Sequence, residues 1–252
     1  MKDKGARSER GHTMRDRSLT TSVRWAAVAI AIALLVASAA PFARAQQREP
    51  SAATVAAWVQ AFYDRTQTMS ARFVQRYTNR VHNRVDTSRG TVRFKKPGMM
   101  RFDYDQPNGK IIRSDGQQLL AYDPPDEGRG PGQFFEQPMS DGQLPAALSF
   151  LTGTGRLSED FRFRLLDAAS LGFPQGKVLE LRSRQPTPHY SRIVLYVDDD
   201  AARRGIVHRI TIVDQSQNQN QFDFTEQRFN TEIADTEFRW RPPRNARRIE
   251  PR

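Results

Sequence analysis

The chain has 252 residues, among them 39 Lys and Arg, 28 Asp and Glu and no Cys, and its formal net charge is +11. This length permits one or two domains with a core that is stable without crosslinks. The absence of Cys excludes disulfide scaffolds, Cys-ligated metal sites, thiol nucleophiles and lipid attachment to a Cys of this chain.

The first 45 residues have the order of a secretory signal peptide. Arginines precede an uncharged run at residues 25–43, and Ala43-Arg44-Ala45 then has the small-x-small form of a signal-peptidase site. An uncleaved membrane anchor is the alternative, because the run is close to the minimum length for a span. We expect residues 1–45 to be a cleaved signal peptide, with residues 1–13 a start-site artefact if translation begins at Met14. Residues 46–53 are then a linker, and residues 54–252 form one domain.

Removal of the expected signal peptide would lower the net charge of the protein. Eight Lys and Arg and three Asp and Glu lie before residue 46, so the remaining 207 residues carry a net charge of +6. Aromatic and Arg residues do interleave, as in Arg72-Phe73 and Arg239-Trp240-Arg241, but a half-buried strand shows the same alternation. We therefore expect modest attraction to anionic membranes or acidic partner surfaces, and no nucleic-acid partner.

The mature part begins with helical periodicity. Thr54 is placed to cap a helix, and Val55, Trp58, Val59 and Phe62 recur at the spacing of one helical face. The pattern predicts an amphipathic helix from Thr54 to about Met69.

Alternation with a period of two then predicts strands. These lie at residues 73–77, 90–95 and 99–104, and a hairpin at 111–122 turns on Asp115-Gly116. Residues 123–142 are rich in Pro and Gly and predict a long loop. A short helix at 144–151, a break at 153–160 and further strands at 161–166, 178–182, 191–197, 206–214, 221–229 and 238–241 complete the chain.

The expected fold is therefore mainly β with some α (α+β). About ten or eleven strands form one large antiparallel sheet, strongly curved, with one apolar and one wet face. The helices fill the apolar concavity as a core or cover it as a lid over a ligand space.

Several segments, in order and behind a signal peptide, resemble the LolA family of periplasmic outer-membrane lipoprotein carriers. The resemblance runs from about Thr54 to Ile249. It rests on Met69–Gln75 after the helix, Gly90–Phe102, the stretch from Ser114 to Pro124, Asn230, and Phe238–Pro243.

The resemblance implies an incomplete β-barrel with an α-helical lid over an apolar cavity. It implies a monomeric periplasmic carrier without catalytic residues, metal or cofactor. Such a carrier receives triacylated lipoproteins from an ABC-type release complex of the inner membrane and passes them to an outer-membrane lipoprotein acceptor. The acceptor needs a lipidated N-terminal Cys, so the Cys-free composition favours the carrier over the acceptor.

Aromatic and Met side chains suit a lipid cavity, because they offer apolar area without directional demands. Ordinary core packing is the alternative for each of them. The candidate lining residues are Trp58, Val59, Phe62, Phe73, Phe94, Met100, Phe102, Tyr104, Leu148, Phe150 and Leu151.

One position departs from the family pattern. The family often has an Arg before the Pro of the strand–turn segment, where it hydrogen-bonds lid carbonyls and holds the empty cavity closed. Here the residue is Lys96, which brings a compact charge on a flexible stem. We expect Lys96 to be the lid latch and to donate to lid carbonyls in the closed state.

Two other functions are compatible with a secreted domain of this kind. A hydrolase would have to use His82, His189 or His208, and none of these lies in a catalytic motif. The run Asp198–Asp200 lacks the alternating ligand pattern of a calcium loop and indicates a solvated turn. The second alternative is a LolA-like binder of a glycolipid or other lipid, or a sensor of mislocalised lipoprotein. The sequence leaves this open, because an apolar cavity does not select its cargo.

Overall fold

The computed structural model describes residues 49–125, 129–139, 150–153 and 155–250. The expected signal peptide, residues 46–48 of the expected linker and most of the helix expected at 144–151, including Leu148, lie outside the described residues. Pro50–Arg252 groups into one compact unit. Across the described ranges, we find no helix with the length and apolar character needed to span a membrane.

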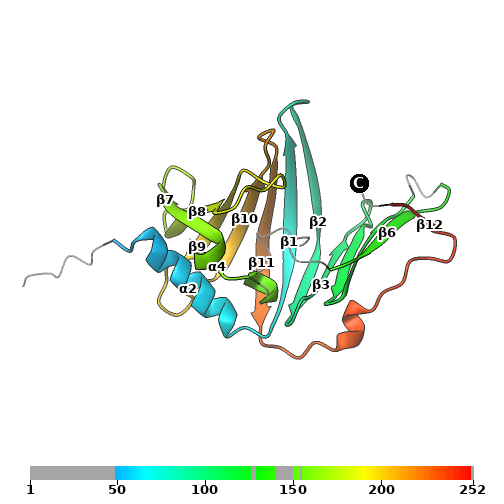
Figure 1. Ribbon diagram of the computed structural model, residues 1–252, viewed down its shortest axis with the longest axis horizontal. Coiled ribbons are helices and arrows are strands. Elements are labelled where there is room, and N and C mark those ends of the chain that lie inside the picture. The colour runs from blue at the N-terminus through cyan, green and yellow to red at the C-terminus, as the bar shows by residue number, and fades with distance from the viewer. Residues whose placement is uncertain (1–48, 126–128, 140–149, 154, 251–252) are drawn as a thin grey trace, which may run out of the picture. The chain divides into compact units, whose positions relative to one another are not determined.

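The described strands form one sheet in the order β12-β6-β5-β4-β3-β2-β1-β11-β10-β9-β8-β7, and only β12 pairs parallel to its neighbour (Figure 1). Their bounds are β1 Thr68–Asn79, β2 Arg84–Lys95, β3 Met99–Tyr104, β4 Ile111–Asp115, β5 Gln118–Asp123, β6 Gln133–Pro138, β7 Phe161–Leu166, β8 Gly176–Ser183, β9 Arg192–Asp198, β10 Val207–Val213, β11 Gln219–Phe229 and β12 Arg247–Arg248.

Two antiparallel runs of strands meet at β1. Strands β1 to β6 follow one another outward from it, whereas β7 starts at the opposite edge and the chain returns to β1 through β11. The sheet therefore has two free ends and is open. This confirms the expected mainly-β fold, with one large antiparallel sheet and few helices.

Helix α2 (Ala52–Asp64) is shorter than expected. Its N-cap is Ser51, whose Oγ accepts a hydrogen bond from the Thr54 backbone N–H at 3.1 Å, so the prediction of Thr54 as the cap is wrong. The helix ends before Met69 because Thr68 already pairs with Lys95 in the β1–β2 ladder. Val55, Ala56, Val59 and Tyr63 face the core.

The loop expected at residues 123–142 contains β6, in which Phe135 pairs with Ala121 of β5. Pro138 stands at the end of this strand, where a missing N–H costs little. The break expected at 153–160 contains the short helix α4 (Leu157–Asp160).

Residues 238–241, which were expected to form a strand, do not form one. Asp235–Phe238 is the 3₁₀ helix η2, and the chain continues without regular structure to β12. Phe238 is fully buried, so its apolar character reflects packing rather than strand pairing.

The main core lies on one face of the sheet, where α2 contacts α4, β7 and β8. Side chains of α2 join inward-facing residues of both runs of strands, including Phe73, Phe94 and Phe102. Gly90 sits below Phe73, and a Cβ there would lie 2.8 Å from the Phe73 ring and 2.1 Å from the Asp103 carbonyl oxygen. Position 90 therefore requires glycine, because any larger residue would clash with the Phe73 ring and with the backbone of β3.

The opposite face is not wet throughout, contrary to expectation. Along β9, Ile193, Leu195 and Val197 enter the main core, whereas the alternate residues Val194 and Tyr196 form a second buried cluster. Beyond β11 the C-terminal segment covers the same face of the other strands, because η2 contacts β3 and β4.

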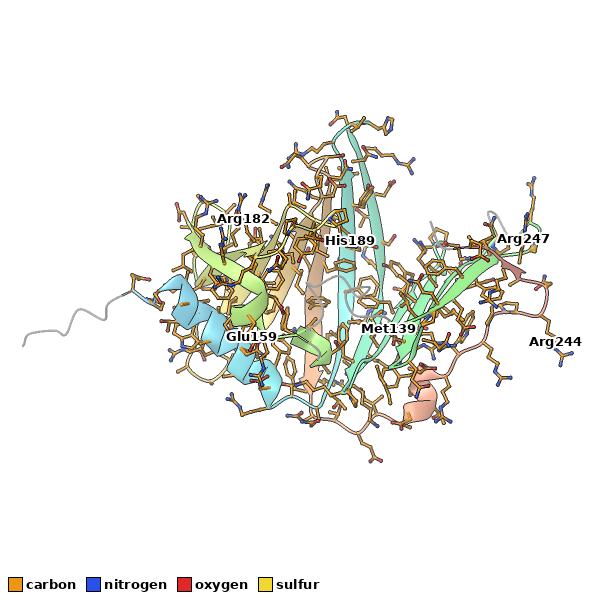
Figure 2. The ribbon with its side chains drawn as sticks, viewed as in Figure 1. Met139, Glu159, Arg182, His189, Arg244 and Arg247 are labelled. Carbon is orange, nitrogen blue, oxygen red and sulfur yellow. The ribbon has the colours of Figure 1, made fainter. Side chains whose placement is uncertain are left out.

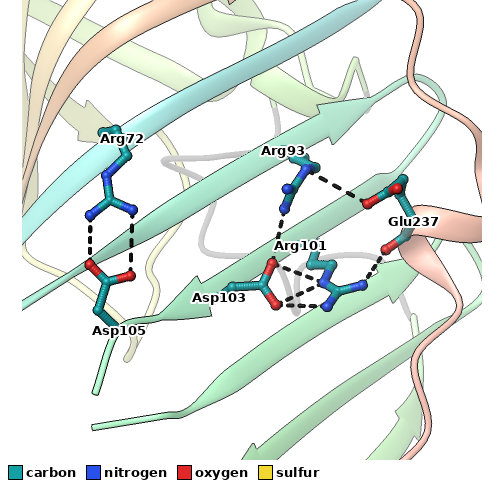
Figure 3. A network of polar contacts seen from close by, with 6 residues as sticks. All are labelled: Arg72, Arg93, Arg101, Asp103, Asp105 and Glu237. Atoms are coloured by element: carbon teal, nitrogen blue, oxygen red, sulfur yellow. Dashed lines mark hydrogen bonds and ion pairs between the residues drawn. The ribbon is translucent and has the colours of Figure 1, made fainter. Parts of the chain in front are cut away.

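Contacts with Glu237 fasten this covering segment (Figure 3). Arg101 donates to the Glu237 carbonyl oxygen at 2.7 Å, and Arg93 pairs with the Glu237 carboxylate at 3.9 Å. Asp103 of β3 in turn pairs with Arg93 at 3.0 Å and with Arg101 at 2.8 Å. Arg72 and Asp105 form a separate bidentate pair on β1 and the end of β3. The outward-facing residues of β2 and β3 are therefore charged although the C-terminal segment covers them, because they form ion pairs and hydrogen bonds beneath it.

Candidate functional site

A pocket of about 390 Å³ lies on the inner face of the sheet and draws side chains from both runs of strands. Its lining residues are Gln75, Met100, Phe102, Tyr104, Asn108, Lys110, Ile112, Leu119, Ala121, Phe135, Ile212, Asn220 and Phe222.

Most of the lining is apolar and aromatic. The Phe102 ring lies 5.9 Å from Phe222 and 5.5 Å from Phe73, in edge-to-face contacts that fix the pocket wall. Met100 adds a flexible thioether beside them. Such a wall offers area to an apolar ligand without demanding hydrogen bonds from it.

The polar lining residues are already bonded within the protein. The Gln75 side-chain amide donates to Asn220 Oδ1 at 2.8 Å. The Asn108 amide donates to Ser88 Oγ at 3.1 Å, and Lys110 pairs with Asp123 at 2.8 Å. The pocket therefore presents satisfied polar groups next to its apolar wall.

Tyr104 contributes a neutral hydroxyl to this pocket. Burial, with a smaller contribution from the charge of Asp123, raises the pKa of Tyr104 to about 12. The phenol is therefore protonated at neutral pH, and no charge develops in the wall at this position.

Three of the expected lining residues reach the pocket. Met100, Phe102 and Tyr104 line it, and they also belong to the main core or pack against it. Val59, Phe73, Phe94, Phe150 and Leu151 lie in the main core, with Trp58 and Phe62 packed against it. The 5.8 Å contact between Phe94 and Phe102 makes core and pocket wall continuous.

Sequence reasoning missed much of the lining. Phe135 lies in a stretch that its Pro and Gly content assigned to a loop, so no strand face was defined for it. Ile212 and Phe222 lie on strands that were expected, but β10 and β11 are distant from β4 to β6 in the sheet order. Alternation gives the face of a strand, and it gives no information on which strands a curved sheet brings to one pocket.

Lys96 lies directly after β2 and reaches the C-terminal end of α2. Its Nζ donates to the Tyr63 carbonyl oxygen at 2.5 Å and to that of Asp64 at 3.4 Å. Carbonyls in the last turn of a helix lack intrahelical partners, and a cation there also complements the helix dipole. Partial burial lowers the pKa of Lys96, while the charge of Asp64 acts in the opposite direction.

The Lys96 stem also passes over Gly153. A Cβ at Gly153 would lie 2.8 Å from Cδ and Cε of Lys96, and the residue has φ of +76°. The backbone N–H of Gly98 donates to the Thr152 carbonyl oxygen at 3.2 Å. Lys96 and its neighbours thus connect the end of β2 with α2 and with the helical turn before Gly153.

Further contacts hold α2 along its length. The Tyr63 hydroxyl accepts a hydrogen bond from the buried Val207 N–H at 3.3 Å, and burial raises the Tyr63 pKa above its usual range. The Arg204 guanidinium lies 4.7 Å from the Trp58 ring centre. Gln60 accepts from the Leu157 N–H of α4 at 2.9 Å.

The described histidines lie on three different segments of the fold. His82 is in the β1–β2 turn, His189 is exposed between β8 and β9 (Figure 2), and His208 of β10 bonds Asp198 at 2.8 Å. Asp198 also pairs with Arg203 at 3.2 Å. Over the described ranges, no group of three or more His, Asp or Glu side chains is placed to hold a metal ion.

Comparison with known proteins gives consistent relatives. An outer-membrane lipoprotein carrier protein of Chromobacterium violaceum is 24% identical over 77% of this chain and 87% of its own length. The carrier protein of Methylobacillus flagellatus is 34% identical over 36% of this chain and 42% of its own length. A solved LolA superfamily protein of Nitrosomonas europaea is 15% identical and has a TM-score of 0.41, covering 76% of this chain and 98% of that one.

The family model described as outer membrane lipoprotein carrier protein LolA matches residues 64–241, which is more than half of the chain. The match includes every strand from β1 to β11 and the residues that line the pocket. The chain belongs to the LolA family.

Proposed function

We propose that the protein is a periplasmic carrier that binds the acyl chains of lipoproteins released from the inner membrane and delivers them to the outer membrane. The observation that carries the proposal is the apolar pocket, walled by Met100, Phe102, Ile112, Phe135 and Phe222, in a member of the LolA family.

The physical requirement is a balance of affinities. Each buried methylene of an acyl chain contributes about 0.8 kcal/mol, so a triacylated protein does not leave a bilayer unaided. A carrier must offer a comparable apolar surface and still release its cargo. An adaptable wall of Met and aromatic groups meets the first need, and a helix that must move before the cargo enters lowers the net affinity.

Lys96 is the proposed latch of that helix. Its bonds to the Tyr63 and Asp64 carbonyl oxygens hold the end of α2 against the sheet in the cargo-free state. Opening the cavity breaks these bonds, and closing remakes them, which favours release of the cargo to the acceptor.

The proposed setting follows from the carrier role. Residues 1–45 direct export and are removed, and residues 54–252 act as a monomeric domain in the periplasm. The cargo arrives from an ABC-type release complex of the inner membrane and leaves to an outer-membrane lipoprotein acceptor. The cycle needs no enzyme activity, metal or cofactor of this chain.

Cargo identity is tested by isolating the protein from the periplasm and analysing bound species by mass spectrometry. Recovery of triacylated peptides supports the carrier. Recovery of free lipid or glycolipid alone contradicts it and favours a lipid binder.

A matched pair of variants locates the cargo. Ile112→Glu places a charge in the pocket wall, and Leu171→Glu places the same charge at an exposed apolar residue outside the pocket. We expect the first variant to lose triacylated peptide and the second to retain it. Equal recovery from both would contradict binding in this pocket.

A further inference from the structure

The β1–β2 hairpin extends beyond the ladders that hold the rest of the sheet. Its two strands pair from Thr68 with Lys95 to Asn79 with Arg84. Strand β3 joins β2 only from Gly90 onward, so among the described strands residues 84–89 have β1 as their one neighbour. Figure 1 shows the hairpin projecting past the neighbouring strands.

Two apolar side chains at the end of this hairpin are exposed to solvent. Val81 in the turn is 71% exposed, and Val85 on β2 is 59% exposed. Among the described residues, the large hydrophobic side chains that are exposed are Tyr77, Val81, Val85 and Leu171, and the first three belong to this hairpin. Tyr77 pairs with Asp86 and Val85 pairs with Thr78, so Tyr77 and Val85 point to opposite faces of the hairpin, and the apolar exposure at its tip comes from Val81 and Val85.

Basic residues accompany the valines. Residues 76–89 contain four Arg and one Asp, which gives a net charge of +3. Arg80 and Arg84 directly precede Val81 and Val85, and the single Asp86 pairs with Arg84 at 2.8 Å. Apolar side chains flanked by Arg are suited to the boundary between acyl chains and anionic headgroups of a bilayer.

The hairpin adjoins polar lining residues of the pocket, Gln75, Asn108 and Asn220, which form its polar end. Gln75 of β1 bonds Asn220 of the neighbouring strand β11. Asn108, also a lining residue, bonds Ser88 on the outer half of β2. The polar side of the pocket is thus tied to the projecting part of the hairpin.

We propose that the tip of the β1–β2 hairpin, residues 80–85, is a peripheral membrane-docking element. Val81 and Val85 enter the interfacial layer of a bilayer, and Arg80 and Arg84 contact anionic lipid headgroups. Docking brings the polar end of the pocket to the membrane surface. The contact is weak and reversible, because two valines and a few charges supply it.

A protein partner fits this tip less well. Stable protein interfaces bury about 800 Å² on each partner, and a turn with two exposed valines does not provide such an area. Bilayer docking needs no shape complementarity and uses the charge and the apolar side chains that are present.

The test is co-sedimentation with vesicles of phosphatidylethanolamine and phosphatidylglycerol, compared with pure phosphatidylcholine. It uses the chain as recovered from the periplasm, with its N-terminus determined by mass spectrometry and with no lipoprotein added. We expect binding to the anionic vesicles that weakens with salt. The double variant Val81→Asp/Val85→Asp should bind about tenfold less, because it places charge where apolar groups enter the interface.

Leu171→Asp is the matched control, since it charges an exposed apolar residue outside the hairpin. It should bind as the unchanged protein does, and thermal unfolding should show that all variants are folded. Arg80→Gln/Arg84→Gln should lower binding to anionic vesicles and leave binding to phosphatidylcholine unchanged.

Three results would overturn the proposal. These are no binding of the unchanged chain to anionic vesicles, equal binding of the double valine variant, and equal loss in the Leu171 control. Absence of vesicle binding together with loss of lipoprotein transfer in the valine variant would assign the tip to a protein partner instead. Because no lipoprotein is added and residues 80–85 do not line the pocket, these results are independent of which cargo the pocket binds.

Discussion

Lys96 Nζ donates to the Tyr63 carbonyl oxygen at 2.5 Å and thereby joins the end of β2 to the end of α2. The preceding residue reaches a different part of the fold, since Lys95 Nζ donates to the Ile233 carbonyl oxygen at 2.7 Å and pairs with Asp235. Two adjacent lysines thus bind backbone carbonyls of helix α2 and of the C-terminal segment. The proposed latch and its neighbouring contact can therefore be tested by separate substitutions within one dipeptide.

The first prediction uses this pair. Lys96→Leu removes both bonds to α2, so we expect it to accept lipoprotein but to transfer it poorly, with about 1 kcal/mol lost from the free energy of unfolding. Lys95→Leu should lower stability through the C-terminal segment and leave transfer unchanged. A two-step transfer assay with purified components measures both. Normal transfer by Lys96→Leu would show that this residue is not a latch.

The second prediction concerns the other bond of Tyr63. Tyr63→Phe removes the acceptor of the buried Val207 N–H while keeping the ring against Phe150. The unpaired donor should cost about 1–3 kcal/mol of unfolding free energy in urea titrations. Tyr77→Phe changes an exposed hydroxyl in the same way and serves as the control. Equal stability of the two variants would mean that the Val207 bond contributes nothing.

The third prediction is a pH dependence at Glu180, which is 4% exposed. Burial acts to raise its pKa, but hydrogen bonds and charges from Arg182 and Arg164 outweigh burial, so the net pKa is lowered. The ionised carboxylate therefore stabilises the fold above its unfolded pKa of about 4.3, and this stability is lost as the pH falls through the lower folded value.

Glu180→Gln should accordingly be less stable than the unchanged protein at pH 7, and the difference should shrink below about pH 4. Thermal unfolding across this range measures it, with Glu159→Gln as an exposed control. A difference that stays constant with pH would contradict the role of the Arg182 and Arg164 bonds.

The fourth prediction compares two glycines, one restricted by the packing around it and the other by its backbone conformation. Gly90→Ala meets the Phe73 ring and the Asp103 carbonyl oxygen, whereas Gly172→Ala meets no atom within 4 Å but has φ of +71°. We expect Gly90→Ala to cost about 1–3 kcal/mol through overpacking and Gly172→Ala about 1–2 kcal/mol through its backbone. Only the first should also alter the near-ultraviolet signal of the aromatic core. An unchanged spectrum would contradict the close contact at Phe73.

The fold class is predictable from alternation, which is strong where one face of a strand is buried. The ranges 73–77, 90–95 and 99–104 alternate in this way, and Phe73, Phe94 and Phe102 are buried. Strand β6 was not predicted, because Pro131, Gly132 and Pro138 are typical of a loop. The strand forms through its pairing with β5, which the local sequence does not reveal. The local sequence also assigned Phe238 to a strand, whereas long-range packing of the C-terminal segment buries this residue.

The pocket was predicted less completely than the fold. Met100, Phe102 and Tyr104 lie on one strand and were found by their common face. Ile212, Phe222 and Phe135 join them only through the curvature of the sheet, which no local pattern encodes. Lys96 was identified only through the resemblance to the LolA family, as the residue before Pro97, and the carbonyl groups that it binds belong to the end of α2.

The central claim is that acyl chains of a lipoprotein occupy the pocket between β4, β6 and β11. Photo-crosslinking tests it most directly, with a photoreactive phenylalanine analogue placed at Phe135 in the wall or at Leu171 outside it. The account predicts that irradiation of the cargo-loaded protein links acylated peptide to position 135 and not to position 171. Equal crosslinking at both positions, or none at 135 while cargo is bound, would contradict it.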